Sequence, residues 1–191
     1  MDDSMSTKPI HLVRVLDANC VRLRVIEEQD LEMVRNWRND PKISQFMLSQ
    51  NTISDSEQKQ WFALVSSSKS QLHFIIEYKG TPIGVANLKA LNSDSLINAT
   101  HIEPGLYIFD DRYRGSFLAF CPAITLNDYC FEVLGCQYLV ARVLPNNEAA
   151  LRYNASLGYE KTNDNDGLIT MQLTPQQYAV KSLGIRRFIR Y

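Results

Sequence analysis

One loop of the chain brings together residue types that can bind an anion. The apolar run 106–109 is typical of a buried strand, and Arg114, Gly115 and Ser116 follow it after a short polar turn. A helical pattern of apolar residues begins at Phe117, so the first amides there lack intrahelical partners and the helix dipole attracts negative charge. Gly115 lets the backbone approach a diphosphate, and Arg114 adds a two-point donor. An ordinary tight turn is the alternative interpretation.

The segments around this loop predict alternating strands and helices that would hold it in place. Strands are expected over 73–78, 82–91, 98–109, 138–144 and 168–173, with an N-terminal hairpin over 10–16 and 20–26. Helices are expected over 27–38, over 54–66 behind the capping box Ser54-Asp55-Ser56-Glu57, after the run 145–150 with its end at Leu157-Gly158, and from Thr174-Pro175 onward. The loop would therefore connect the strand 98–109 to the helix that follows Gly115.

In this order the segments resemble the GNAT acyltransferase superfamily, over about residues 21–173. The resemblance is carried by Arg114-Gly115, by Asn146-Asn147-Glu148-Ala149-Ala150 and by Leu157-Gly158-Tyr159. It implies an α/β fold with one domain and a mixed central β-sheet of about seven strands, splayed at the cofactor strand, with helices on both faces. It also implies acetyl-CoA as cosubstrate. Phe117 departs from the family's Arg/Gln-x-x-Gly-x-Gly/Ala loop, because a second glycine usually stands there.

The same resemblance implies which residues hold the cofactor. In the family, the pantetheine arm pairs with the backbone of the cofactor strand, and the loop holds the pyrophosphate. The implied cofactor-binding residues are Tyr107, Ile108, Phe109, Arg114, Gly115, Ser116, Phe117, Leu118, Ala119, Asn147 and Arg152. Asn147 would contact the pantetheine through its side chain, whereas Arg152 would contact phosphate or be an ordinary solvated helix residue.

Two residues are implied as catalytic. Glu103 lies two positions before Gly105, where related enzymes often have a glutamate, and it could accept the amine proton directly or through a water. A solvated salt bridge is the alternative for Glu103, and an amine that is neutral before it binds would need no base. Tyr153 would protonate the leaving thiolate, although a count back from Gly158 places Asn154 at the usual tyrosine position.

A second run, Trp37-Arg38-Asn39-Asp40-Pro41, indicates the acceptor. It recurs in two GNAT branches: one acetylates nucleotide-linked amino sugars, as on the way to pseudaminic acid, and one resembles the ribosomal-protein N-terminal acetyltransferases. Phe46-Met47 and Trp61-Phe62 look more like the sugar branch. The implied substrate-binding residues are Arg38, Met47, Trp61, Asn87 and Lys89. The expected function is therefore acetyl transfer to the primary amine of a small molecule, with a nucleotide-linked amino sugar preferred.

Other functions stay open on the sequence alone. The acceptor could be a protein N-terminus or another small amine, such as a polyamine or an antibiotic. A polyamine enzyme should have an acidic acceptor side, which the run 37–41 does not indicate. A non-catalytic CoA-binding module is the alternative of a different class.

Composition limits the partners. The 191 residues, 45% of them hydrophobic, suffice for one acetyltransferase domain over 1–191, with a flexible N-terminus over 1–9 and a C-terminal helix and tail over 175–191. A net charge of −1 gives no general attraction to nucleic acid or to a membrane, so neither partner is expected. Related enzymes are often homodimers, which makes a homodimer the oligomer to test.

The cysteines and the N-terminal residues bear on metal and location. The four cysteines, at 20, 121, 130 and 136, form no C-x-x-C pair and have no histidine cluster beside them, so buried thiols and no metal are expected. The polar residues 1–8 do not resemble a signal peptide, and no apolar run could span a bilayer. A cytoplasmic protein is expected.

Overall fold

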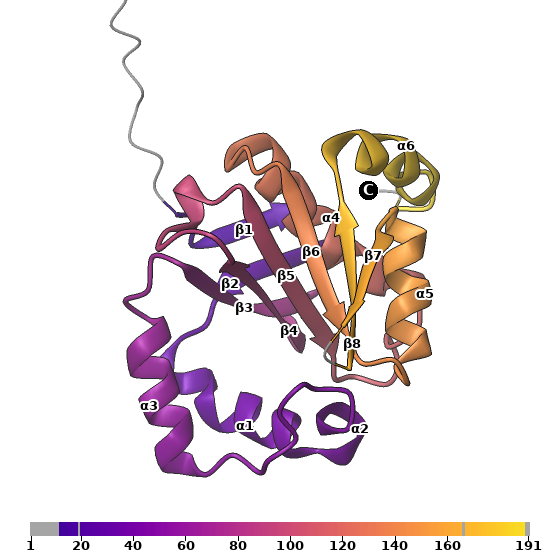
Figure 1. The fold of residues 1–191 in the computed structure, drawn as a ribbon. Coiled ribbons are helices and arrows are strands. Elements are labelled where there is room, and N and C mark those ends of the chain that lie inside the picture. Colours follow the sequence, from indigo (N-terminus) through magenta and orange to yellow (C-terminus); the bar gives the residue numbers. More distant parts are fainter. Residues whose placement is uncertain (1–11, 19, 166, 190–191) are drawn as a thin grey trace, which may run out of the picture.

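The computed structural model describes residues 12–18, 20–165 and 167–189, so the expected flexible segment 1–9 lies outside the described residues. Within this part of the chain, eight strands form one mixed sheet in the order β1-β2-β3-β4-β5-β6-β8-β7 (Figure 1). The strands are β1 Val15–Ala18, β2 Val21–Val25, β3 Gln71–Tyr78, β4 Thr81–Ala90, β5 His101–Ile108, β6 Tyr138–Val143, β7 Glu160–Asn165 and β8 Leu168–Leu173. Neighbouring strands are antiparallel except β5 and β6, which are parallel.

The sheet has eight strands where about seven were expected. Its outermost strand, β7, is polar throughout and has no alternation of apolar residues, so the sequence marks it weakly. It forms by pairing with β8, and Gly167 adopts a φ of +74° in the turn between them. At the other edge, β1 begins at Val15 rather than near residue 10, and the described residues before it are not in a strand.

The expected splay is present in the middle of the sheet. β6 pairs with β5 only at His101–Tyr138 and Ile102–Leu139, among the described residues. β4, in contrast, follows β5 along its length, from Ala90–Ile102 to Gly84–Ile108. The edge of β5 that faces β6 is therefore open beyond Ile102.

Helices cover both faces of the sheet, as expected. Their bounds are α1 Leu31–Asn39, α2 Pro41–Ser44, α3 Asp55–Val65, α4 Phe120–Asp128, α5 Glu148–Leu157 and α6 Pro175–Arg186. α1 and α3 pack on Ile75 and Val85 of one face, where Figure 1 shows them together with α2. α4 packs on the opposite face and forms the main core there, which α5 and α6 join through Leu157 and Tyr178.

The first helix begins later than expected. A single 3-10 turn, Glu28–Asp30, precedes α1, and the side chain of Asp30 accepts a hydrogen bond from the Glu27 amide at 2.8 Å. Arg24 of β2 binds both carboxylate oxygens of Asp30, at 2.7 and 2.8 Å, and its Nε donates to Glu77 at 2.8 Å. Asp30 thus joins α1 to the sheet through a buried ion pair, in addition to capping the turn.

The cysteines differ from the expectation in one respect. Cys121, Cys130 and Cys136 are buried, but Cys20 is exposed. The Cys20 sulfur lies 2.8 Å from that of Cys121, because the turn after β1 meets α4 there. None of the described helices is both long enough and apolar enough to cross a membrane.

Candidate active site

Strand alternation places polar side chains on the sheet face that α1 and α3 cover. Ile102 and Ile108 of β5 belong to the main core on the opposite face. Side chains alternate along a strand, so Glu103, Gly105 and Tyr107 lie on the face of α1 and α3. Tyr107 packs against the small apolar cluster that these helices form with the sheet.

Two of the expected acceptor residues meet on this face through a histidine. Asn87 of β4 pairs with Gly105 on one side and with His73 of β3 on the other. A Cβ at Gly105 would lie 2.7 Å from Asn87 Oδ1, so the glycine leaves room for this side chain. Trp61 of α3 meets the His73 ring edge-on, with 4.8 Å between centroids. Burial lowers the pKa of His73 to about 4, so the imidazole is neutral near pH 7.

Two more of the five expected acceptor residues, Lys89 and Met47, lie at the margin of this group. Lys89 is exposed, and it lies opposite Glu103 in the register of β4 and β5. Met47 is half-buried in the turn after α2, and it is not among the described side chains that pack with Trp61 on the small apolar cluster. The sequence reasoning missed His73, because a lone histidine in an apolar strand carries no signal of its own.

The open edge of β5 has the geometry that an extended ligand chain requires. The amide of Phe109 donates to Ile83 of β4 at 2.8 Å. Backbone groups alternate in direction along a strand, so Tyr107 also faces β4, whereas Leu106 and Ile108 face the open edge. Of the three residues expected to pair with pantetheine, Ile108 alone faces this edge, and Leu106 joins it. The sequence shows the strand but not which residues face which neighbour.

The loop after β5 leads into a helix with unpaired amides. Ser116 precedes a 3-10 turn, Phe117–Ala119, which continues into α4. Within the described part of the chain, the amides of Gly115, Phe117 and Leu118 donate no hydrogen bond. Gly115 has a φ of +73°, and no atom lies within 4 Å of where its Cβ would stand. Free amides at a helix start, with open space above a glycine, fit a diphosphate.

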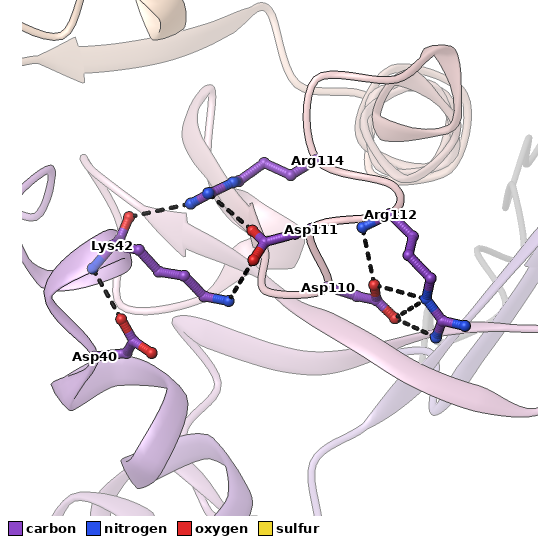
Figure 2. Close-up of polar contacts among 6 residues, drawn as sticks. All are labelled: Asp40, Lys42, Asp110, Asp111, Arg112 and Arg114. Atoms are coloured by element: carbon purple, nitrogen blue, oxygen red, sulfur yellow. Dashed lines mark hydrogen bonds and ion pairs between the residues drawn. The ribbon is translucent and has the colours of Figure 1, made fainter.

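Arg114, the expected phosphate ligand, is held by an acid in this structure. Its Nη2 lies 2.8 Å from Asp111, and the other oxygen of Asp111 lies 3.1 Å from Lys42 Nζ (Figure 2). Nη1 of Arg114 also donates to the main-chain oxygen of Lys42 at 3.4 Å. The Arg114 side chain is 43% exposed, so it is free to exchange Asp111 for a phosphate. Arg112 pairs separately with Asp110.

The run 37–41 positions Lys42 against the end of β5. Trp37 stacks on the ring of Phe109, with 5.1 Å between centroids, and Lys42 Nζ lies 3.7 Å from the centre of that ring. Asp40 caps α2 by accepting from the Lys42 amide at 2.9 Å (Figure 2). Asn39 holds the segment before α3 through two hydrogen bonds with the backbone of Ile53. The motif therefore brings α1, α2 and the loop together.

Arg38, the remaining member of this run, has a buried nitrogen without a partner in the described part of the chain. Its Nη2 donates to the main-chain oxygen of Ser49, but its Nη1 makes no hydrogen bond with any described residue. The Tyr107 hydroxyl and Arg35 Nε are likewise buried and unpartnered among the described residues. Burial lowers the pKa of Arg38 and raises that of Tyr107, and the charge of Arg38 opposes the second shift. Buried donors left unpaired are costly, so this group fits a ligand that accepts hydrogen bonds.

Glu103, the expected base, is paired across the splay. Arg142 of β6 donates from Nε to its Oε1 at 2.9 Å and from Nη2 to its Oε2. The Glu103 side chain is only 16% exposed, and the ion pair raises the pKa of Arg142. Arg142 was missed by the sequence reasoning. Its signal is a single charge in the otherwise apolar and aromatic strand Tyr-Leu-Val-Ala-Arg-Val.

Asn147 and Arg152 have clear roles in α5. Asn147 begins the helix, because its Oδ1 accepts from the Ala150 amide at 3.1 Å, which leaves its amino group to donate to a ligand. Arg152 pairs with Glu148 at 3.0 Å one helical turn away, and both side chains are more than 70% exposed. This geometry is that of a solvated helix residue, the alternative that the sequence left open for Arg152.

Tyr153, the expected general acid, connects α5 to the loop. Its hydroxyl donates to the main-chain oxygen of Ala119 at 2.7 Å, and its ring stacks on Phe120 with 4.7 Å between centroids. Burial raises the pKa of Tyr153 above its ordinary value. The hydroxyl therefore stays protonated, and in this structure it donates a hydrogen bond to a carbonyl at the start of α4.

Comparison with known proteins gives the family of this arrangement. Residues 21–160 match the family model described as "Acetyltransferase (GNAT) domain". No curated protein sequence matches the chain. The described residues hold no group of three or more histidine, cysteine, aspartate or glutamate side chains that could bind a metal ion.

Similar solved structures include three acetyltransferases with different acceptors in their descriptions. FdhC, described as a nucleotide-linked sugar GNAT, is 22% identical, with 92% of this chain and 98% of that chain covered and a TM-score of 0.75. Spermidine N-acetyltransferase from Vibrio cholerae, in complex with CoA and spermine, is 18% identical over 85% and 99%, with a TM-score of 0.73. Aminoglycoside acetyltransferase AAC(6')-Ib with coenzyme A is 22% identical over 85% and 99%, with a TM-score of 0.71. At these identities the similarity shows the fold.

Proposed function

This chain belongs to the GNAT family of acetyltransferases, and we propose that it acetylates the primary amine of a small anionic molecule, with a nucleotide-linked amino sugar as the preferred acceptor. Family membership gives the enzyme class, an acyltransferase whose donor is acetyl-CoA. One observation carries the choice of acceptor: Nη1 of Arg38 and the hydroxyl of Tyr107, two groups that interact electrostatically, are both buried without a partner among the described residues.

The donor side follows from the open edge of β5 and the loop beyond it. Acetyl-CoA supplies an acetyl group that is activated as a thioester. Leu106 and Ile108 offer backbone groups on the open edge to the pantetheine arm. The amides of Gly115, Phe117 and Leu118 offer three donors to the diphosphate, and Arg114 adds a charge once it leaves Asp111. These contacts position the thioester and so lower the entropic part of the barrier.

The acceptor side is basic where it is buried. Arg38 and Arg35 each have a buried nitrogen without a partner among the described residues, and neither nitrogen can accept a hydrogen bond. A phosphate or diphosphate supplies the acceptor oxygens that both nitrogens lack, and arginine binds such groups in two-point fashion. A polyamine or an aminoglycoside would bring positive charge to these nitrogens. The anionic acceptor is therefore favoured over the cationic ones.

The proposed chemistry places Glu103 at the amine. Its carboxylate lies on the same face and the same strand as Tyr107, two residues from Gly105, and could accept the proton that the attacking amine loses. Arg142 holds both carboxylate oxygens and so fixes the orientation of Glu103. Tyr153 is the proposed donor of a proton to the thiolate, and delivery would require its hydroxyl to leave Ala119. Asn87 and Trp61 would then contact the sugar.

The experiment is a measurement of CoA release with a panel of amines. The panel contains a nucleotide-linked amino sugar, the same amino sugar without its nucleotide, an N-terminal peptide, spermidine and an aminoglycoside. The proposal predicts the highest kcat/KM for the nucleotide-linked sugar. A higher kcat/KM for spermidine or the aminoglycoside would overturn the anionic acceptor while leaving the acetyltransferase in place.

Two further properties belong to the same proposal. We place the enzyme in the cytoplasm, where acetyl-CoA and nucleotide-linked sugars are available to it. We also propose a homodimer, as in related enzymes. Light scattering of the purified full chain tests the second point, and a monomer at micromolar concentration would contradict it.

A further inference from the structure

The aromatic residue that replaces a loop glycine is not buried in the core. Phe117 is 38% exposed, although its ring contacts that of Phe120 with 5.7 Å between centroids. Its second neighbour comes from the far end of the chain, because Phe188 meets it edge-on at 5.4 Å. Phe188 is 74% exposed. Two rings from distant segments therefore meet at the surface, directly beside the loop.

The position of Phe188 is fixed by the residues around it. Its amide donates to Ile185 at 3.0 Å, and the next residue, Ile189, is 6% exposed and belongs to the main core. α6 is held on α4 by the Tyr178 hydroxyl, which donates to Asp128 at 2.7 Å. The backbone is thus anchored on both sides of Phe188 while its ring stays in solvent. An exposed ring on an anchored backbone is preorganised for a ligand.

The neighbourhood of the two rings identifies the kind of ligand. The amide of Phe117 donates to none of the described residues, so this one residue presents both a diphosphate donor and an aromatic surface. A ligand that uses both must join a diphosphate to a flat aromatic group. Stacking on aromatic side chains binds nucleobases without regard to their hydrogen-bonding edges.

We propose that Phe117 and Phe188 form the binding surface for the adenine base of CoA. This inference rests on the proposed donor site, and it adds the nucleotide end of the molecule to the loop and the open strand edge. Phe117 stands at a loop position where the family usually has a glycine, which has no side chain. Phe188 comes from the C-terminal segment beyond α6. The base would take up space that the rings leave open to solvent.

Calorimetric titration with two ligands tests the surface. CoA contains the adenosine, and 4'-phosphopantetheine lacks it while keeping the arm and one phosphate. In Phe188→Ala, affinity for CoA should fall by about 5- to 100-fold, the range expected for the loss of one stacking partner. Affinity for 4'-phosphopantetheine should stay the same, and Phe188→Trp should restore CoA binding. Leu183→Ala is the control, because Leu183 is a similarly exposed apolar residue of α6, 61% exposed.

The outcomes separate this inference from the proposed function. An unchanged CoA affinity in Phe188→Ala would overturn the adenine surface and leave the acetyltransferase intact. Equal losses for CoA and 4'-phosphopantetheine would also overturn it, because they would indicate a structural effect on the loop. If the wild-type protein bound neither ligand, the donor site itself would be wrong. A loss confined to CoA supports the inference.

Discussion

Glu103 of β5 and Arg142 of β6 form a two-point ion pair across the opening of the sheet. The pair lies beyond the last backbone pairing of the two strands, at Ile102–Leu139. It connects the strand that should hold the thioester to the strand that leads to α5. The Glu103 carboxylate is therefore oriented by Arg142, which is the one charged residue of β6.

Replacing Glu103 tests whether this carboxylate accepts the amine proton. Glu103→Gln keeps the shape but cannot accept a proton, so the rate at neutral pH should fall by about a hundredfold. Much of the loss should return at high pH, where the amine is already neutral, and acetyl-CoA affinity should not change. Arg142→Gln is the control, because it removes the pair and keeps the carboxylate, so its loss should be smaller. Parallel pH–rate profiles for wild type and Glu103→Gln would remove Glu103 from the mechanism.

Replacing Asp30 tests the ion pair that joins α1 to the sheet. The Asp30 side chain is 6% exposed and the Arg24 side chain is 20% exposed. Asp30→Asn should lower the free energy of unfolding by about 1–3 kcal/mol, because the largely buried Arg24 then keeps only Glu77 as a charge partner. Glu148→Gln, in the exposed pair with Arg152, should change it little. Urea denaturation of both variants measures the difference, and equal effects would contradict the assignment.

The same ion pair gives a pH dependence. The hydrogen bond and charge of Arg24, with the Glu27 amide, outweigh burial and hold the pKa of Asp30 below its ordinary 3.8. A carboxylate with a lowered folded pKa contributes stability that is full above the unfolded pKa and is lost as pH falls through the folded one. Wild type should therefore lose stability below about pH 4 more steeply than Asp30→Asn.

His73 should give stability a second pH dependence, at higher pH. Burial lowers its pKa from 6.5 to about 4, so the unfolded chain binds more protons between these values. Stability should therefore rise with pH from about 4 to 6.5, by on the order of 2–3 kcal/mol, and be constant above that. His73→Gln should flatten this rise. Denaturant midpoints measured across the interval check it, and an unchanged slope in the variant would contradict the burial of a neutral imidazole.

Arg114 should be required for CoA binding. Arg114→Glu places a negative charge at the diphosphate, so CoA affinity should fall by at least about tenfold. Arg112→Glu is the control, because it makes the same charge change two residues earlier in the loop, at an arginine paired with Asp110 rather than with Asp111, and its effect should be smaller. Titration calorimetry with CoA compares the two variants. Equal affinities in wild type and Arg114→Glu would exclude Arg114 from the donor site.

Local chemistry made much of this fold predictable. The predicted capping box at Ser54 and helix cap at Thr174 are both present, because each depends on residues three positions apart. The order of strand, loop and helix around Gly115 was also predictable, because it depends on residues that are close in the sequence. β7 was weakly marked, since it is polar and forms through its partner.

The candidate site was less predictable, because its geometry depends on register. Sequence shows Glu103 but not Arg142, since only the parallel pairing of β5 and β6 brings them together. It shows Tyr107 and Phe109 in a strand, but the direction of their backbone groups depends on how β4 pairs with β5. The sequence predicts an acceptor motif in the run 37–41. The structure shows, in addition, that Trp37 of this run and Lys42 of α2 both contact the ring of Phe109.

The most direct test of the proposed function uses Arg38 and two acceptors, one with and one without a nucleotide and its diphosphate charge. These are a nucleotide-linked amino sugar and the same amino sugar without the nucleotide, assayed by CoA release in wild type and Arg38→Ala. Loss of a charged hydrogen-bonding partner should raise the KM for the nucleotide-linked acceptor by about tenfold or more, with little change in the KM for acetyl-CoA. The KM for the acceptor without the nucleotide should hardly change, so the preference of the wild type should shrink. Equal changes for both acceptors, or a change in the KM for acetyl-CoA alone, would contradict an anion site at Arg38.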